Sequence, residues 1–169
     1  MTSASLTSSS TVVGKTGATL TVTFVPKNII KTTGSLVLVF PLRCCTNFHM
    51  LEVDNPICTG VTTLKTSLTC SYVKTSRMLT ITNILASDQA GGTSMSFTVD
   101  NLINPDSTYP KSGFSLTSYD NTGGQIDTIS LTLTVSDWGT LLFPTITHDV
   151  QTVNTNSVVT LKFSNPYSV

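Results

Sequence analysis

Alternation of apolar and polar residues along many short segments is the feature that most constrains how this chain folds. In residues 18–25 (ATLTVTFV), Leu20, Val22 and Phe24 fall on one face and three threonines fall on the other. A period of two is typical of a β-strand with one buried face. The pattern predicts strands of this kind at residues 18–25, 67–73, 77–84, 94–102, 113–119 and 128–135.

One segment departs from the alternation in an informative way. Residues 35–42 (SLVLVFPL) are apolar nearly throughout, which indicates a strand buried on both faces. Residues 74–76 are predicted to turn segment 67–73 back onto segment 77–84 as a hairpin. Seven or so short strands separated by Gly-, Asn-, Asp- and Pro-rich turns are typical of two sheets packed face to face. The fold class predicted is therefore all-β, an antiparallel β-sandwich.

Composition supports this fold class and excludes others. Charged residues make up only 11% of the chain, while Ser and Thr together account for 53 of its 169 residues. Glu, Lys, Arg and Ala are too scarce for a helical protein. The nine acidic residues balance the nine basic ones, so the basic excess of a nucleic-acid binder is missing. No apolar stretch is long enough to cross a bilayer, so we expect neither nucleic acid nor a membrane span.

The cysteines indicate an oxidising compartment. Cys44, Cys45, Cys58 and Cys70 form an even, clustered set without the spacing of a zinc site, which predicts two disulfides and an extracellular or cell-surface location. Adjacent residues on a strand point to opposite faces. We therefore expect Cys44 and Cys45 to bond to Cys58 and Cys70 rather than to each other, with the order of pairing open.

Targeting and modification signals are sparse. Residues 1–10 (MTSASLTSSS) have neither the basic start nor the apolar stretch of a signal peptide, so we expect a mature chain or a segment of a longer one. No asparagine begins an N-x-Ser/Thr sequon, which excludes ordinary N-glycosylation. The abundant hydroxyls leave O-linked glycans as the modification to expect.

A repeat is the most informative pattern near the C-terminus. Residues 159–163 (VTLKF) resemble residues 20–24 (LTVTF), each after a polar turn and each followed by a proline. Upstream, Ile146-Thr147 corresponds to Leu6-Thr7 with a shift of one residue. We interpret this likeness as one complete unit followed by the start of a second. The domains predicted are a β-sandwich at 1–135, a linker at 136–144, and a partial second repeat or donated strands at 145–169.

Two further stretches carry recognisable motifs. In residues 36–45 an apolar strand runs into Pro and Cys, and residues 101–127 contain Asn-Pro, Ser/Thr-x-Pro, a Phe strand, Asp-x-x-Gly and Ile-Asp. Together they cover about a fifth of the chain. They resemble a repeat domain of large extracellular surface proteins of protists such as ciliates. The resemblance implies an immunoglobulin-like extracellular module, present in tandem or in filaments, and implies no catalysis.

Residues with catalytic or metal-binding chemistry are few, and each has a simpler structural interpretation. His49 lies close to Cys45, but a disulfide-bonded cysteine is no nucleophile. Ser71 and Lys74 fit S-x-x-K, but at a strand end and without companion motifs. Asp120, Asn121 and Asp127 lack the carboxylate density of a Ca²⁺ loop. We therefore predict no enzyme activity, no cofactor and no metal site.

The function that this pattern favours is structural. A lone hairpin is marginal in water, so the strands of 145–169 need a partner, and the repeat suggests another copy. The chain is predicted to be a self-assembling subunit of an extracellular filament or surface layer. The assembly interface predicted consists of Trp138, Ile146, Val153, Val158, Leu161 and Phe163. The alternative is a carbohydrate-binding or adhesive cell-surface module, with sugars stacked on Trp138, Tyr109, Tyr119 and Tyr167.

Overall fold

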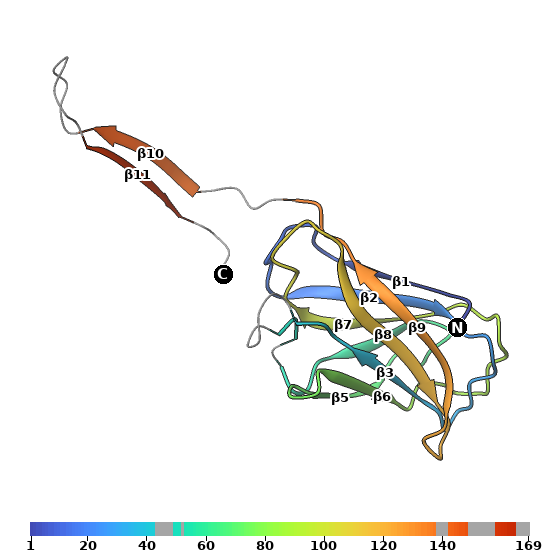
Figure 1. Ribbon diagram of the computed structural model, residues 1–169. Coiled ribbons are helices and arrows are strands. Elements are labelled where there is room, and N and C mark those ends of the chain that lie inside the picture. Colours follow the sequence, from blue (N-terminus) through green and yellow to red (C-terminus); the bar gives the residue numbers. More distant parts are fainter. Residues whose placement is uncertain (43–48, 52, 138–141, 149–157, 165–169) are drawn as a thin grey trace.

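The computed structural model describes residues 1–42, 49–51, 53–137, 142–148 and 158–164 (Figure 1). In these ranges the chain forms eleven β-strands and no helix. The strands are β1 (Ser3–Ser8), β2 (Ala18–Val25), β3 (Ser35–Val39), β4 (Cys58–Thr62), β5 (Thr69–Val73), β6 (Met78–Thr82), β7 (Met95–Leu102), β8 (Lys111–Tyr119), β9 (Gln125–Leu133), β10 (Leu142–His148) and β11 (Val159–Ser164).

Nine of these strands build an immunoglobulin-like antiparallel sandwich, as predicted. One sheet has the order β1-β2-β7-β4 and the other the order β5-β6-β3-β8-β9. Immunoglobulin domains pair strands A-B-E-D in one sheet and G-F-C in the other, with C′ and C″ added beside C in variable domains. The spatial plan here is the same. The order along the chain differs, because β4 occupies the D position yet precedes the β5–β6 hairpin.

The core lies between the two sheets and follows the predicted alternation. Leu20, Val22 and Phe24 of β2 are fully buried, while the threonines between them are half-buried. Phe24 meets Phe97 of β7 edge to face at 6.3 Å between ring centroids. In β3, both Leu36 and Val37 are buried although they point to opposite faces, because β3 is the central strand of its sheet. The prediction of burial on both faces is confirmed for residues 36–38, whereas Val39 is half-buried and the strand ends there.

Two strands of the sandwich were missing from the predicted set. β1 has a single buried apolar residue, Leu6, and β4 (CTGVT) contains a glycine and two threonines. Both are edge strands of the four-stranded sheet, with one neighbour each. Each places a single apolar side chain in the core, Leu6 or Cys58, so its sequence carries little of the alternation that marks a strand.

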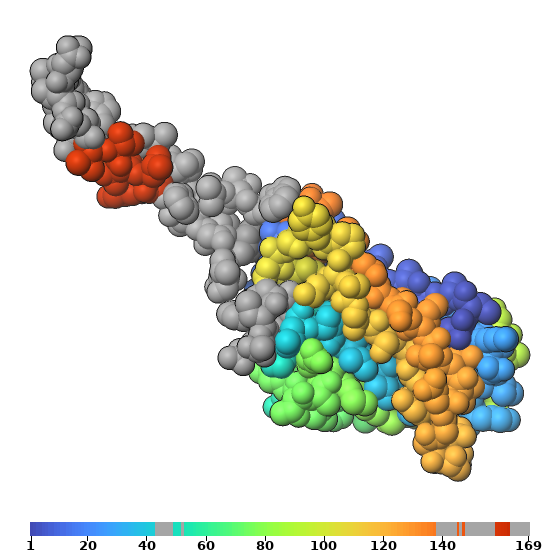
Figure 2. Space-filling model, in the orientation of Figure 1, coloured from blue at the N-terminus to red at the C-terminus, as the bar shows by residue number. Residues whose placement is uncertain are grey.

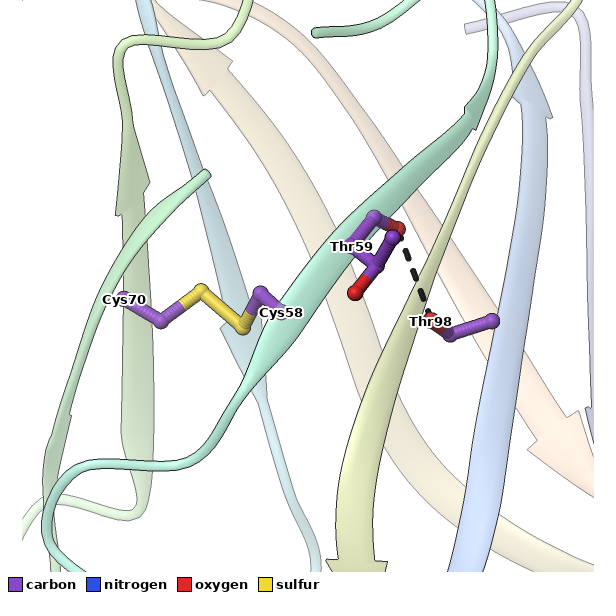
Figure 3. Close-up of a disulfide and its surroundings, with 4 residues drawn as sticks. All are labelled: Cys58, Thr59, Cys70 and Thr98. Atoms are coloured by element: carbon purple, nitrogen blue, oxygen red, sulfur yellow. Dashed lines mark hydrogen bonds between the residues drawn. A yellow bond between two sulfur atoms is a disulfide. The ribbon is translucent and has the colours of Figure 1, made fainter. Parts of the chain in front are cut away.

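The disulfide pairing predicted from the sequence is wrong. Cys58 and Cys70 are bonded to each other, with 6.1 Å between their Cα atoms, so neither can take Cys44 or Cys45 as a partner (Figure 3). The reason is the position of β4 and β5, which are the edge strands of different sheets on the same side of the sandwich. The bond therefore ties the two sheets together. Cys44 and Cys45 lie outside the described residues.

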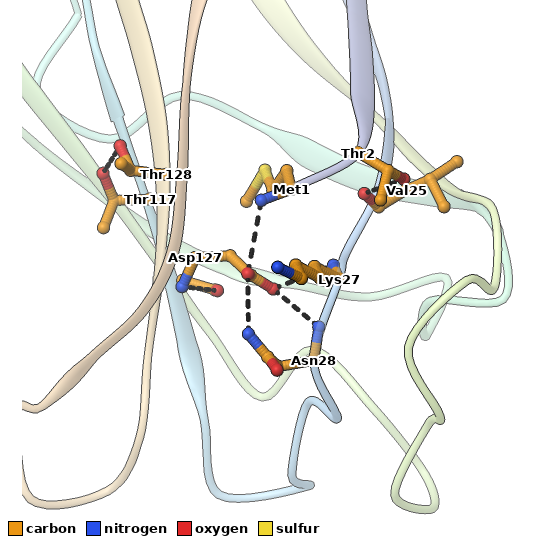
Figure 4. Close-up of polar contacts among 9 residues, drawn as sticks. Met1, Thr2, Val25, Lys27, Asn28, Thr117, Asp127 and Thr128 are labelled. Carbon is orange, nitrogen blue, oxygen red and sulfur yellow. Dashed lines mark hydrogen bonds and ion pairs between the residues drawn. The ribbon is translucent and has the colours of Figure 1, made fainter.

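A buried carboxylate ties the sheets together near the end of β2. Asp127 of β9 is 5% exposed and accepts hydrogen bonds from the backbone amides of Lys27 and Asn28, each at 3.1 Å (Figure 4). The Asn28 side-chain amide donates to it at 3.0 Å, and the Met1 ammonium group lies 3.2 Å away. Burial alone would raise the pKa of Asp127, but these donors and the ammonium charge lower that pKa below its ordinary value.

Candidate functional site

The hairpin of β10 and β11 is the candidate functional site, because its strands form a two-stranded sheet of their own. The two strands are antiparallel, with Ile146 opposite Leu161 and Thr147 opposite Thr160. In the part of the chain that the structure describes, neither strand joins a sheet of the sandwich. The space-filling view shows the same separation between the coloured atoms of the hairpin and those of the sandwich (Figure 2).

The register of this hairpin repeats that of β1 and β2. Ile146 lies 140 residues after Leu6, and Leu161 lies 139 residues after Val22; Leu6 and Val22 are themselves paired. With these offsets, four consecutive pairs coincide: Ser5–Thr23 with Thr145–Lys162, Leu6–Val22 with Ile146–Leu161, Thr7–Thr21 with Thr147–Thr160, and Ser8–Leu20 with His148–Val159. Alternation alone does not impose this register, because a slip of two residues would also keep apolar residues opposite each other.

Equivalent positions in the two hairpins differ in burial. Leu20 and Val22 on β2 are fully buried, whereas their counterparts Val159 and Leu161 on β11 are 61% and 63% exposed. The opposite face of β11 is open as well, because Thr160 and Lys162 are both exposed. β11 therefore presents to solvent the apolar face that β2 buries in the sandwich.

The residues predicted for the assembly interface are described unevenly. Val158 precedes β11 and is 64% exposed, and Leu161 lies on β11. Ile146 and Phe163 are placed on β10 and β11 at backbone level only. Trp138 and Val153 lie outside the described residues, so their part in the interface stays a prediction.

The other residues considered in the sequence are held in structural roles. Asp120 accepts hydrogen bonds from the backbone amides of Thr122 and Gly124 and from the Thr122 hydroxyl, which closes the turn before β9 and lowers the pKa of Asp120. Ser71 lies in the middle of β5 rather than at a strand end as expected, and Lys74 follows the last residue of that strand. His49 is half-buried opposite Leu42. Within the described ranges, no group of three His, Cys, Asp or Glu residues could hold a metal ion.

The aromatic platform considered for sugars is not assembled as a unit. Tyr109 precedes β8 and Tyr119 ends it, so about nine residues of extended strand, roughly 30 Å, separate them. Trp138 and Tyr167 lie outside the described residues. Tyr109 alone of the four is strongly exposed in the described part of the chain, at 79%.

Within the described ranges, the chain has no helix that is long and apolar enough to cross a membrane. No family model matches the chain, and no curated protein matches it. The link to protist surface proteins therefore stays a prediction, although the sandwich fold that it implied is present.

Among solved structures, the chain is similar to a non-cellulosomal cohesin from the hyperthermophilic archaeon Archaeoglobus fulgidus. The TM-score is 0.38 at 14% identity, over 79% of this chain and 91% of that one. A likeness this distant carries no argument about function, and the fold assignment rests on the two sheets themselves.

Proposed function

We propose that this chain is a non-catalytic, self-assembling structural subunit of an extracellular filament or surface layer. In this proposal, β10 and β11 supply the first two strands of a further sandwich, whose remaining strands come from another copy of the same unit. The observation that carries the proposal is the shared register of the two hairpins together with the exposed apolar face of the second.

The energetics of the hairpin favour a partner of this kind. A two-stranded hairpin is marginal in water on its own. Burying a side chain such as Val159 or Leu161 stabilises an assembly by about 1.5–3 kcal/mol each. The partner that fits best is a sheet like the one that covers Leu20 and Val22, because the hairpin repeats their positions.

The proposed extracellular setting has independent support. A disulfide such as Cys58–Cys70 persists in oxidising compartments and is rare in the cytosol. The formal net charge of zero removes long-range repulsion between copies, which suits close repetition of one unit.

The test compares two lysine substitutions on neighbouring residues of β11. Leu161→Lys places a charge on the apolar face, where a partner sheet would leave the charge buried and unpaired, whereas Thr160→Lys places the same charge on the opposite face. Sedimentation velocity over a range of concentrations, with electron microscopy of the concentrated samples, measures self-association. We expect fibres from the unaltered chain and at least tenfold weaker association for Leu161→Lys than for Thr160→Lys. Equal effects of the two substitutions would refute the proposed interface.

Carbohydrate binding remains the second candidate function, and one observation favours it. Tyr109 is 79% exposed and lines a cleft that is also lined by Arg77 and Lys111. An exposed aromatic ring is a typical stacking surface for a sugar. Binding at this cleft would be compatible with assembly through β10 and β11, because the two sites involve different strands.

A further inference from the structure

A cleft of about 640 Å³ lies at the end of the five-stranded sheet, away from the β10–β11 hairpin in sequence. It forms where the chain leaves β3 and where β6 and β8 begin. Phe40 and Pro41 line it from the β3 side, Arg77 from the turn before β6, and Tyr109 and Lys111 from the start of β8. The strand order brings these residues together, because β3 pairs with β6 on one side and with β8 on the other.

The described lining of the cleft has one sign of charge. Arg77 and Lys111 contribute two cations, Ser107 and Ser112 contribute hydroxyl groups, and the described lining contains no Asp or Glu. This is a local excess in a chain whose nine basic residues are matched by nine acidic ones. A concave, cationic, hydroxyl-bearing surface attracts an anion by charge and can hold it by hydrogen bonds.

Arg77 occupies a backbone conformation that its side chain does not favour. Its φ is 58°, in the left-handed region. Its carbonyl accepts a hydrogen bond from the amide of Phe40, and its amide donates to the carbonyl of Lys74. Gly or Asn would make the same backbone contacts with less strain. The turn therefore does not need an arginine side chain, and an unfavourable conformation of this kind is typical of functional positions.

The position of the cleft bears on the kind of ligand it can take. An extended peptide usually binds a sheet by adding a strand to a free edge. The cleft lies instead at the end of β3, which is paired on both sides. What the cleft offers beside its charges is the ring of Tyr109, 79% exposed, on which the apolar face of a sugar ring can stack.

From this geometry we propose that the cleft is a binding site for an acidic saccharide, an inference that rests on carbohydrate binding, the second candidate function. The guanidinium group of Arg77 pairs with a carboxylate or sulfate group of the sugar, because its planar fork matches the two oxygens. Lys111 adds a second positive charge, and Tyr109 stacks against the adjacent sugar ring. The same chemistry serves uronic acids and sulfated sugars, so the test includes both.

The test measures binding of the full chain to three oligosaccharides by calorimetry: an oligogalacturonate, a sulfated dextran fragment and a neutral maltohexaose. We expect at least one of the two acidic probes to bind, more weakly as salt is added, and the neutral probe to bind at least tenfold more weakly. Equal binding of the neutral probe, or binding of neither acidic probe, would overturn the proposal. Binding of hexaglutamate as tight as that of the acidic sugars would overturn the saccharide assignment in favour of an acidic peptide.

Variants separate a binding role from a structural one. Arg77→Asn should weaken binding at least tenfold while leaving the melting temperature unchanged or higher, because Asn tolerates the left-handed conformation. Lys111→Gln and Tyr109→Leu should each weaken binding several-fold. Lys27→Gln is the matched control. Lys27 is exposed in the connection before β3, so this substitution also removes one positive charge, but at the opposite end of that strand. Binding that survives Arg77→Asn, or that falls equally with Lys27→Gln, would refute the site.

Discussion

The β1–β2 and β10–β11 hairpins share a sequence pattern and a pairing register, yet the apolar face of β2 is buried and that of β11 is exposed. In the first, Leu6 and Val22 face a core built by the opposite sheet. In the second, Leu161 stands at the position of Val22 and is 63% exposed. The comparison shows that the same pairing register occurs with a buried and with an exposed apolar face. Burial of the apolar face depends on further strands, which the second hairpin lacks in the described part of the chain.

The largest expected effect is the difference in free energy of unfolding between truncating an apolar side chain of β2 and truncating one of β11. Leu20→Ala removes a fully buried side chain and should lower the free energy of unfolding by about 2–5 kcal/mol, through lost burial and a cavity. Leu161→Ala, made in the dilute monomer, should change it by less than about 0.5 kcal/mol. Urea unfolding of both variants measures the contrast. Similar losses from the two substitutions would mean that β11 is packed in the same core as β2.

The Cys58–Cys70 disulfide links the two sheets of the sandwich covalently. Replacing Cys58 and Cys70 together by serine should lower the free energy of unfolding by about 3 kcal/mol, because the bond closes a loop across 12 residues of sequence separation. The denaturant midpoint of the double variant against the parent measures this loss. Peptide mapping without reduction should recover Cys58 and Cys70 in one linked species, and a Cys58–Cys44 or Cys58–Cys45 link would contradict the fold.

Asp127 should give a smaller effect that depends on pH. Because its pKa is lowered in the fold, its stabilising contribution is complete above the ordinary Asp pKa of 3.8. As the pH falls below 3.8, this stabilisation decreases, and it is lost once the pH has passed the lower pKa that Asp127 has in the folded state. Asp127→Asn should lower the free energy of unfolding by about 1–3 kcal/mol at pH 7. The gap from the parent should narrow below pH 4, and a gap that is constant with pH would argue against a charged Asp127 in this role.

O-linked glycosylation is the last prediction, and it should change the free energy of unfolding least. Thr147 and Thr160, which pair in the second hairpin, are exposed, as is Thr7 in the first. We expect O-linked sugar on exposed Ser or Thr residues of protein from its natural source, and none on Asn. An intact mass equal to that of the bare 18.0 kDa chain would contradict this expectation.

Much of the fold could be predicted from alternation, and the failures lie where alternation is weak or where two sheets meet. β2 and β7 stand where expected because each places several apolar residues in the core. β1 and β4 were missing from the predicted set because each places only one apolar side chain in the core. The partner of Cys58 could not be inferred either, because it depends on β4 and β5 facing each other across two sheets.

The β10–β11 hairpin and the cationic cleft also differ in whether they could be found from the sequence. The C-terminal strands could be found from sequence because their pattern repeats an earlier one within a few residues. The cationic cleft could not, because Arg77 and Lys111 lie 34 positions apart and meet only when β6 and β8 flank β3. Sequence reasoning singled out Tyr109 as an aromatic residue but had no signal for its cationic neighbours.

Deletion of residues 140–169 tests most directly whether the second hairpin belongs to a separate unit. We expect the shortened chain to keep the melting temperature of the dilute parent, because no strand of the sandwich is lost. We also expect the shortened chain to stay monomeric by sedimentation at concentrations where the parent assembles into fibres. A shortened chain that unfolds or melts many degrees lower would place β10 and β11 in the first sandwich and contradict the account, as would fibres formed without them.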